Sequence, residues 1–269
     1  MDSLILTVAL GALIGLVMAL TGAGGGVMAI PLLVFGLHLP VQQAAPVGLV
    51  AVGLAAILGA ALGLRQGIVR YRAAALIGSA GMLMAPLGVL LAQRLPNRPL
   101  LGAFALVLIY TAWRMLRRPN PSVAHVAAAV LCRVNRLDQR LTWTLPCARA
   151  LTGSGLIAGL LSGLLGVGGG FVIVPALTRY TDLDIRSIQL TSLAVIALVS
   201  VSGVLAAATH GPVRWDVALP FASGAVLALL AGQQIAKKLN AKGLQKAFAW
   251  FSVLVAIFML ARAMGWVSN

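Results

Sequence analysis

Glycines gather at two places in the sequence where their spacing could build an anion site. The first cluster reads Gly22-Ala23-Gly24-Gly25-Gly26 and the second reads Gly166-Val167-Gly168-Gly169-Gly170; we call them the glycine knots. Each knot lies inside a long apolar run, and a proline (Pro31 or Pro175) follows five residues later. Because glycine costs a helix about 1 kcal/mol relative to alanine at each position, four glycines in five residues predict a helix break.

A helix that begins just after such a break presents unpaired N–H groups and the positive end of its dipole, which together bind anions. Irregular backbone at membrane depth persists only where protein or a water-filled cavity covers it. Broken helices at the bilayer midplane hold anionic substrates in transporters built from inverted repeats. The knots therefore predict a substrate site, and close helix packing on small residues is the alternative.

Polar side chains near the knots could complete this site. Thr21 precedes the first knot, while Gln189, Thr191 and Ser192 open a later apolar segment. Their hydroxyl and amide groups could donate to substrate oxygens, or the hydroxyls could bond back to their own helix. The predicted substrate-binding residues are Thr21, Gly22, Gly24, Gly25, Gly26, Gly166, Gly168, Gly169, Gly170, Gln189, Thr191 and Ser192.

A second motif, Gly-x-Val-Arg-aromatic, contains Arg70 and Arg214. The two guanidinium groups could attract anions at the mouths of a pathway, or they could anchor the chain at the membrane interface beside Tyr71 and Trp215. We assign a motif or structural role to Arg70, Arg214, Pro31 and Pro175.

Composition places the chain in a membrane. Of the 269 residues, 61% are hydrophobic and 9% charged, with a mean hydropathy of +1.02, far from the balance of soluble domains. The net charge of +15 fits the setting of membrane orientation better than nucleic-acid binding. Cys132 and Cys147 lack metal-ligand spacing and are expected as free thiols rather than a disulfide or a metal site. No cofactor is expected, and no catalytic motif indicates an enzyme.

The expected fold is an all-α polytopic membrane protein with two membrane repeats, residues 1–116 and 151–269. A basic linker, residues 117–150, joins them, and its centre (123–143) could be an amphipathic surface helix or a plain basic loop. Apolar runs predict helices at 4–20, 27–39, 44–64, 73–92 and 99–116, and then at 151–165, 171–180, 188–209, 217–236 and 244–263.

The second set of segments repeats the first. Identities recur at a fixed offset of 144 residues, from Gly11 and Gly155 to Phe104 and Phe248. Inverted copies with a cytoplasmic linker place 16 of the 20 Lys and Arg residues inside, against 12 for parallel copies, so the positive-inside rule favours inversion. The segment at 171–180 would span only about 15 Å as a helix. This favours a re-entrant helix pair over two full crossings.

The doubled glycine knot with its proline, and Thr191-Ser192-Leu193 at the start of a helix, resemble the TauE/SafE sulfite exporter family. The first half has Val47-Gly48-Leu49 instead of a Thr-Ser-Leu counterpart. The resemblance covers nearly the whole chain outside the linker, and its signature positions are the knot glycines, Pro31 and Pro175. It implies a bacterial inner-membrane permease for sulfite, sulfonates or related organosulfur anions.

The sequence thus predicts a multi-pass inner-membrane secondary transporter that exports a small sulfur oxyanion. A passive anion channel, an uptake permease and a non-transporting membrane assembly protein are the alternatives. The expected partners are a small anionic substrate, the lipid bilayer and a second copy of the chain in a homo-oligomer, but no nucleic acid.

Overall fold

The computed structural model describes residues 2–21, 25–116, 131–132, 134–135, 140–141, 144–210, 213–235, 250 and 253–261. Within these ranges helices dominate, and only the linker contains strands. The helices are α1 (Asp2–Thr21), α2 (Gly26–Gly36), α3 (Val41–Arg65), α4 (Tyr71–Arg94), α5 (Asn97–Leu116), α6 (Leu145–Leu165), α7 (Gly170–Tyr180), α8 (Ile185–His210), α9 (Trp215–Ile235) and an unlabelled helix at 253–261.

The predicted all-α polytopic membrane fold is confirmed. Five helices are long and apolar enough to cross a membrane, namely α3, α4, α6, α8 and the first 18 residues of α9. The expected apolar segments are helical in their described parts, except that α2 ends at Gly36 and leaves 37–39 outside the helix. Runs of Leu, Val and Ala form helices because a helix satisfies all backbone hydrogen bonds within one segment.

For the linker centre, 123–143, the sequence left open an amphipathic helix or a plain basic loop, and its described part contains no helix. Strands β1 (Val134–Asn135) and β2 (Arg140–Leu141) pair antiparallel, with Val134 opposite Leu141. A helix cannot run through this pair, and residues 123–130 lie outside the described residues. The paired strands turn the chain back toward the start of α6.

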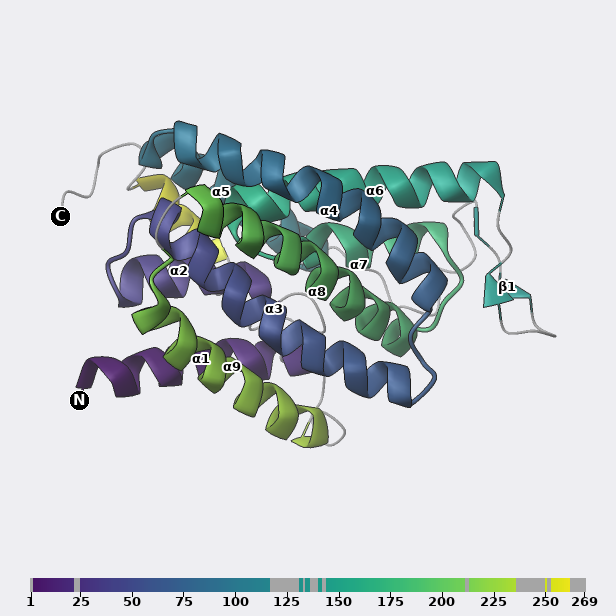
Figure 1. Ribbon diagram of the computed structural model, residues 1–269, viewed down its shortest axis with the longest axis horizontal. Coiled ribbons are helices and arrows are strands. Elements are labelled where there is room, and N and C mark those ends of the chain that lie inside the picture. The colour runs from purple at the N-terminus through teal and green to yellow at the C-terminus, as the bar shows by residue number, and fades with distance from the viewer. Residues whose placement is uncertain are drawn as a thin grey trace.

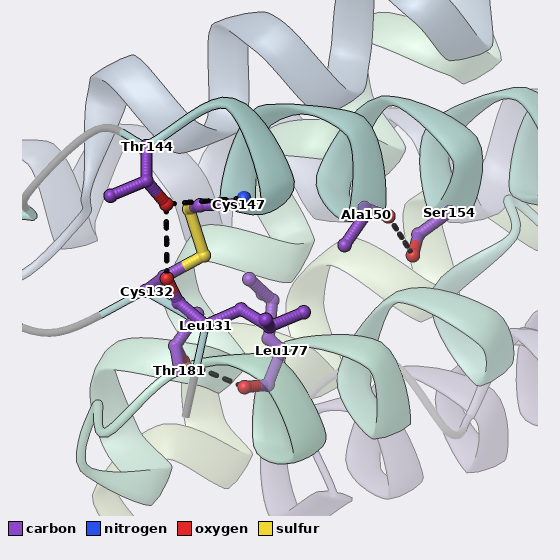
Figure 2. The surroundings of a disulfide bond; sticks show 8 residues. All are labelled: Leu131, Cys132, Thr144, Cys147, Ala150, Ser154, Leu177 and Thr181. Atoms are coloured by element: carbon purple, nitrogen blue, oxygen red, sulfur yellow. Dashed lines mark hydrogen bonds between the residues drawn. A yellow bond between two sulfur atoms is a disulfide. The ribbon is translucent and has the colours of Figure 1, made fainter. Parts of the chain in front are cut away.

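The expectation of free thiols was wrong, because Cys132 and Cys147 form a disulfide (Figure 2). Their Cα atoms lie 5.2 Å apart, and both residues are buried. The Cys132 N–H donates to the carbonyl of Tyr180 at 2.9 Å, so the bridge joins the linker, the first turn of α6 and the end of α7. A cross-link that closes a loop of about 15 residues is worth about 3 kcal/mol.

The first helix of each half packs against the fourth helix of the other half. In both places an alanine-sized side chain would strike the facing backbone, so glycine is required for the approach. The pairs are Gly11 on Phe221 and Gly15 on Ala225 between α1 and α9, and Gly155 on Ile77 and Gly159 on Gly81 between α6 and α4. These pairs are equivalent at the 144-residue offset, with the partners exchanged.

Helices α3 and α8, which occupy equivalent places in the two halves, lie side by side between these flanks (Figure 1). They run antiparallel, since Leu49 of α3 lies near Gly203 and Gly63 of α3 lies near Leu190. Equivalent helices of the two halves therefore point in opposite directions along the bundle. How this axis is oriented in the bilayer stays a prediction.

The connections gather at two ends of the bundle. At one end the Ser187 hydroxyl donates to the carbonyl of Ile68 at 2.9 Å, and the Cys132 N–H of the linker donates to the carbonyl of Tyr180. At the other end the Val41 N–H donates to the side chain of Asn97 at 3.1 Å. The loop at 66–70, the linker strands and the α7–α8 connection therefore share one end.

Candidate anion site at the glycine knots

The second knot breaks the chain between α6 and α7 as predicted. Gly166, Gly168 and Gly169 have φ values of 70°, 76° and 72°, in the left-handed region that only glycine adopts at little cost. The Gly166 N–H caps α6 by donating to the carbonyl of Ser162 at 2.8 Å. A new helix then begins at Gly170, and its first N–H groups have no carbonyl within the helix to bond.

α7 begins beside α6 at about two thirds of its length rather than at its end. A Cβ on Gly169 would lie 2.7 Å from the carbonyl of Ala158, seven residues before α6 ends at Leu165. From there α7 runs back for 11 residues, about 16 Å, to Tyr180 beside the disulfide. α6 has 21 residues, the length of a full span. Of the two helices on either side of the second knot, only α7 is half-length.

The first knot repeats this arrangement where it is described. Gly22, Ala23 and Gly24 lie outside the described residues, as does the side chain of Thr21, the last residue of α1. Gly25 lies against α1, where its Cβ would be 2.9 Å from the carbonyl of Ile14, the equivalent of Ala158. α2 then runs for 11 residues from Gly26.

The two half-length helices begin at the same place in the middle of the bundle. A Cβ on Gly26 would lie 2.6 Å from the carbonyl of Val167 in the second knot, and 3.3 Å from Val52 of α3. Gly168 packs between Val52 and Ile196, residues near the midpoints of α3 and α8. Gly25, Gly26 and residues 166–170 are all buried.

Electrostatics favour an anion at this place. Each helix N-terminus carries about half a positive charge, so two meeting ends offer about one unit. The low dielectric of a buried site strengthens their attraction for a negative ligand. The five acidic residues of the sequence, Asp2, Asp138, Asp182, Asp184 and Asp216, all lie away from the knots along the chain.

The predicted polar residues of α8 already have hydrogen-bond partners. Thr191 Oγ1 accepts the Arg70 N–H at 3.1 Å, and the Ser192 hydroxyl donates to the carbonyl of Ile188 at 2.7 Å. Gln189 is partly exposed on α8. The equivalent of Gln189 in the first half is Ala45, which packs on Gly166. By the same symmetry Gln189 would pack on Gly22, which is not among the described residues. Their role as ligands stays a prediction.

Two buried serines near the second knot escaped the sequence analysis. Ser162 and Ser200 are 0% and 1% exposed, and neither hydroxyl has a hydrogen-bond partner among the described residues. Their only sequence signal is that the equivalent positions in the first half hold Met18 and Ala56. A serine in place of Met18 or Ala56 can be interpreted only when the helix face that carries it is known.

Of the four motif residues, Arg70 and Arg214 lie at the ends of the bundle, away from the knots. Pro31 and Pro175 lie in the helices that follow the knots. Arg70 and Arg214 stand just before α4 and α9, at opposite ends of the bundle, and Arg214 forms an exposed 2.7 Å ion pair with Asp216. Pro31 and Pro175 lie inside α2 and α7, both buried. In the described part of the chain, no group of three or more His, Cys, Asp or Glu side chains could hold a metal ion.

Comparison with known proteins places these features in a family. Residues 7–259 match the family model described as sulfite exporter TauE/SafE. A protein named "Probable membrane transporter protein" from Xylella fastidiosa strain Temecula1 is 28% identical over 99% of this chain and 98% of its own length. A protein of the same name from strain 9a5c matches with the same identity and coverage. No solved structure shows a significant match.

Proposed function

The chain belongs to the sulfite exporter TauE/SafE family of membrane transporters, and on that premise we propose that it exports a small sulfur oxyanion, such as sulfite or an organosulfonate. It acts as a secondary transporter in the bacterial inner membrane, with the linker on the cytoplasmic side. It binds the anion without transforming it and needs no cofactor. A homo-oligomer is compatible with this proposal, since each chain carries both knots.

The meeting of the α2 and α7 N-termini at mid-depth supports the proposal most directly. Two helix ends that face one buried place provide unpaired N–H groups and positive potential without any fixed positive side chain. An oxyanion can exchange its hydration shell for these groups and leave again, because no Arg or Lys in the knots holds it by a full charge.

Transport requires the site to open to each side in turn. Gly25, Gly26 and the whole second knot are buried, so the described arrangement corresponds to an occluded state. In transporters with inverted repeats, one repeat moves against the other about a fixed central site. Here the helix pairs α1–α9 and α4–α6, each formed between the two halves, are expected to move as rigid flanks. The short helices α2 and α7 lie between these flanks and the central helices.

Flux measurements in proteoliposomes test this function. We expect purified protein to carry out [35S]sulfite counterflow, and expect Gly169→Leu and Gly25→Leu to lower it at least about tenfold. A side chain at Gly169 meets the carbonyl of Ala158 and needs a positive φ, while one at Gly25 meets Met18 and Ile14.

Gly153→Leu is the matched control, because a Cβ at Gly153 of α6 has no atom within 4 Å. Size-exclusion profiles of all three variants separate loss of transport from loss of fold. Full flux in both knot variants would exclude the knots as the site. A wild-type protein that carries no sulfur oxyanion would refute the proposed substrate.

A passive anion channel is the main competing function, because the middles of the apolar runs contain no Asp or Glu to couple transport to protons. Planar-bilayer recordings distinguish the two: discrete single-channel steps indicate a channel, and their absence with persistent counterflow indicates a carrier. Counterflow from either face leaves the direction open, so export is checked by sulfite efflux from loaded cells. Flux that needs an added partner would instead indicate an assembly protein.

A further inference from the structure

The two knots are each followed by an 11-residue helix, but they differ in the side chains around them. In the first half Met18 faces Gly25, and its Cγ would lie 2.5 Å from a Cβ at that position. In the second half the equivalent residue is Ser162, a much smaller side chain one turn beyond Ala158 on the α6 face that meets Gly169. The serine replaces the larger methionine and brings a hydroxyl group to the second knot that the first lacks.

A second difference lies on the central helices. Ser200 of α8 points toward the second knot, with its Oγ 3.6 Å from the position of a Cβ on Gly168. Its equivalent on α3 is Ala56, which has no polar group to offer. The second knot is thus flanked by serines from two helices: the carbonyl of Ser162 on α6 accepts the Gly166 N–H at 2.8 Å, and Ser200 on α8 faces Gly168.

Both hydroxyls are buried without a hydrogen-bond partner in the described ranges. A buried polar group that stays unpaired costs about 1–3 kcal/mol, so two at one place call for a ligand. A hydroxyl can donate to an oxyanion while the α7 N–H groups donate from another direction. An apolar residue at either position would have avoided the cost.

We infer that the chain binds one oxyanion, at the second knot, and that Ser162 and Ser200 are specificity-determining ligands. The first knot, where Met18 and Ala56 stand in place of the two serines, contributes the start of α2 to this place but no hydroxyl ligand. This inference rests on the proposed function for the identity of the anion, but the place and number of sites stand on the two serines. Oxygen-rich anions are selected over halides, because two hydroxyls and a row of N–H groups match several acceptor oxygens.

Equilibrium binding of [35S]sulfite to the purified wild-type chain and its serine variants tests the inference. We expect one bound sulfite per chain in the wild type. Ser162→Ala and Ser200→Ala should each weaken binding about tenfold or more, as expected for loss of a hydrogen bond to a charged group, with a matching rise in the KM for counterflow. Chloride should compete poorly in the wild type and relatively better in the variants.

Ser154→Ala is the matched control. Ser154 lies on the same helix and is buried, but its hydroxyl already donates to the carbonyl of Ala150 at 2.7 Å (Figure 2). Sulfite affinity should be unchanged in this variant.

The outcomes separate this inference from the proposed function. Normal wild-type flux with unchanged affinity in both serine variants, or two sulfites per wild-type chain, overturns the inference and leaves the transporter intact. Serine-dependent binding without flux supports the site and refutes the transport function. If neither sulfite, sulfate nor taurine binds the wild type, both are wrong.

Discussion

At the scale of single residues, the hydroxyl groups of the bundle fall into two kinds. Thr191, Ser192 and Ser187 join helices or bond their own helix, whereas the Ser162 and Ser200 hydroxyls have no partner among the residues described. The first kind contributes to stability and the second is available to a ligand. Position within the same helix does not separate them, since Ser192 and Ser200 both belong to α8.

Thr191→Val tests this division at the residue predicted from the sequence as a ligand. Thr191 Oγ1 accepts the Arg70 N–H across 121 positions of the chain, and the substitution removes this hydrogen bond, at a cost of about 0.5–1.5 kcal/mol. We expect a lower Tm in detergent and an unchanged KM for sulfite. Thr178→Val is the control, because the exposed Thr178 hydroxyl bonds only its own helix. A raised KM at unchanged Tm would instead make Thr191 a ligand.

At the scale of elements, glycine has two different structural roles in this fold. In the second knot it supplies positive φ, which ends α6 at Gly166 and starts α7 after Gly169. Along α6 it lets another backbone approach, and a Cβ at Gly159 would strike the carbonyl of Gly81 in α4. Small residues allow such close packing in membranes, where burial of apolar surface drives little association.

Gly159→Ala should therefore destabilise the α4–α6 flank by about 1–3 kcal/mol, the usual cost of overpacking. Gly153→Ala on the same helix has open space and should be neutral or slightly stabilising, since alanine is the better helix former. Thermal unfolding of both variants in one detergent gives the comparison. Equal Tm values for the two would contradict the packing role.

The sequence predicted the elements well and their long-range partners poorly. Apolar run length and glycine content are local properties, so the helices and the break at Gly166 could be predicted from the sequence. The Cys132–Cys147 bridge was not, because a spacing of 15 residues says nothing about whether β1 and β2 turn the chain back. The serines at the second knot required the α6 and α8 faces to be known first.

At the scale of the whole molecule, the ends of the bundle carry a prediction about sidedness. Arg65, Arg72 and Arg186 lie at the linker end, while Arg94 and Arg98 lie at the other. The positive-inside rule then places the linker end in the cytoplasm. Bacterial cytoplasm keeps thiols reduced, so the cysteines should be found as thiols in growing cells and as the disulfide after purification in air.

Impermeant maleimide labelling of intact cells checks this topology. In the Cys132→Ser, Cys147→Ser background, which removes both cysteines of the chain, Pro96→Cys should be labelled from outside and Gln66→Cys only after the cells are opened. Both positions are exposed, at opposite ends of the bundle. The reverse labelling pattern would invert the assigned orientation.

The packing of each half's first helix against the other half also determines when the helices can meet during synthesis. α1 finds its main partner in α9, which leaves the ribosome roughly 190 residues later, or about 10 to 40 s at bacterial rates. During that interval the glycine face of α1, with Gly11 and Gly15, has only lipid or an insertion factor to cover it. The first helix to enter the membrane is therefore among the last to reach its final neighbour, and neither half can complete its packing alone.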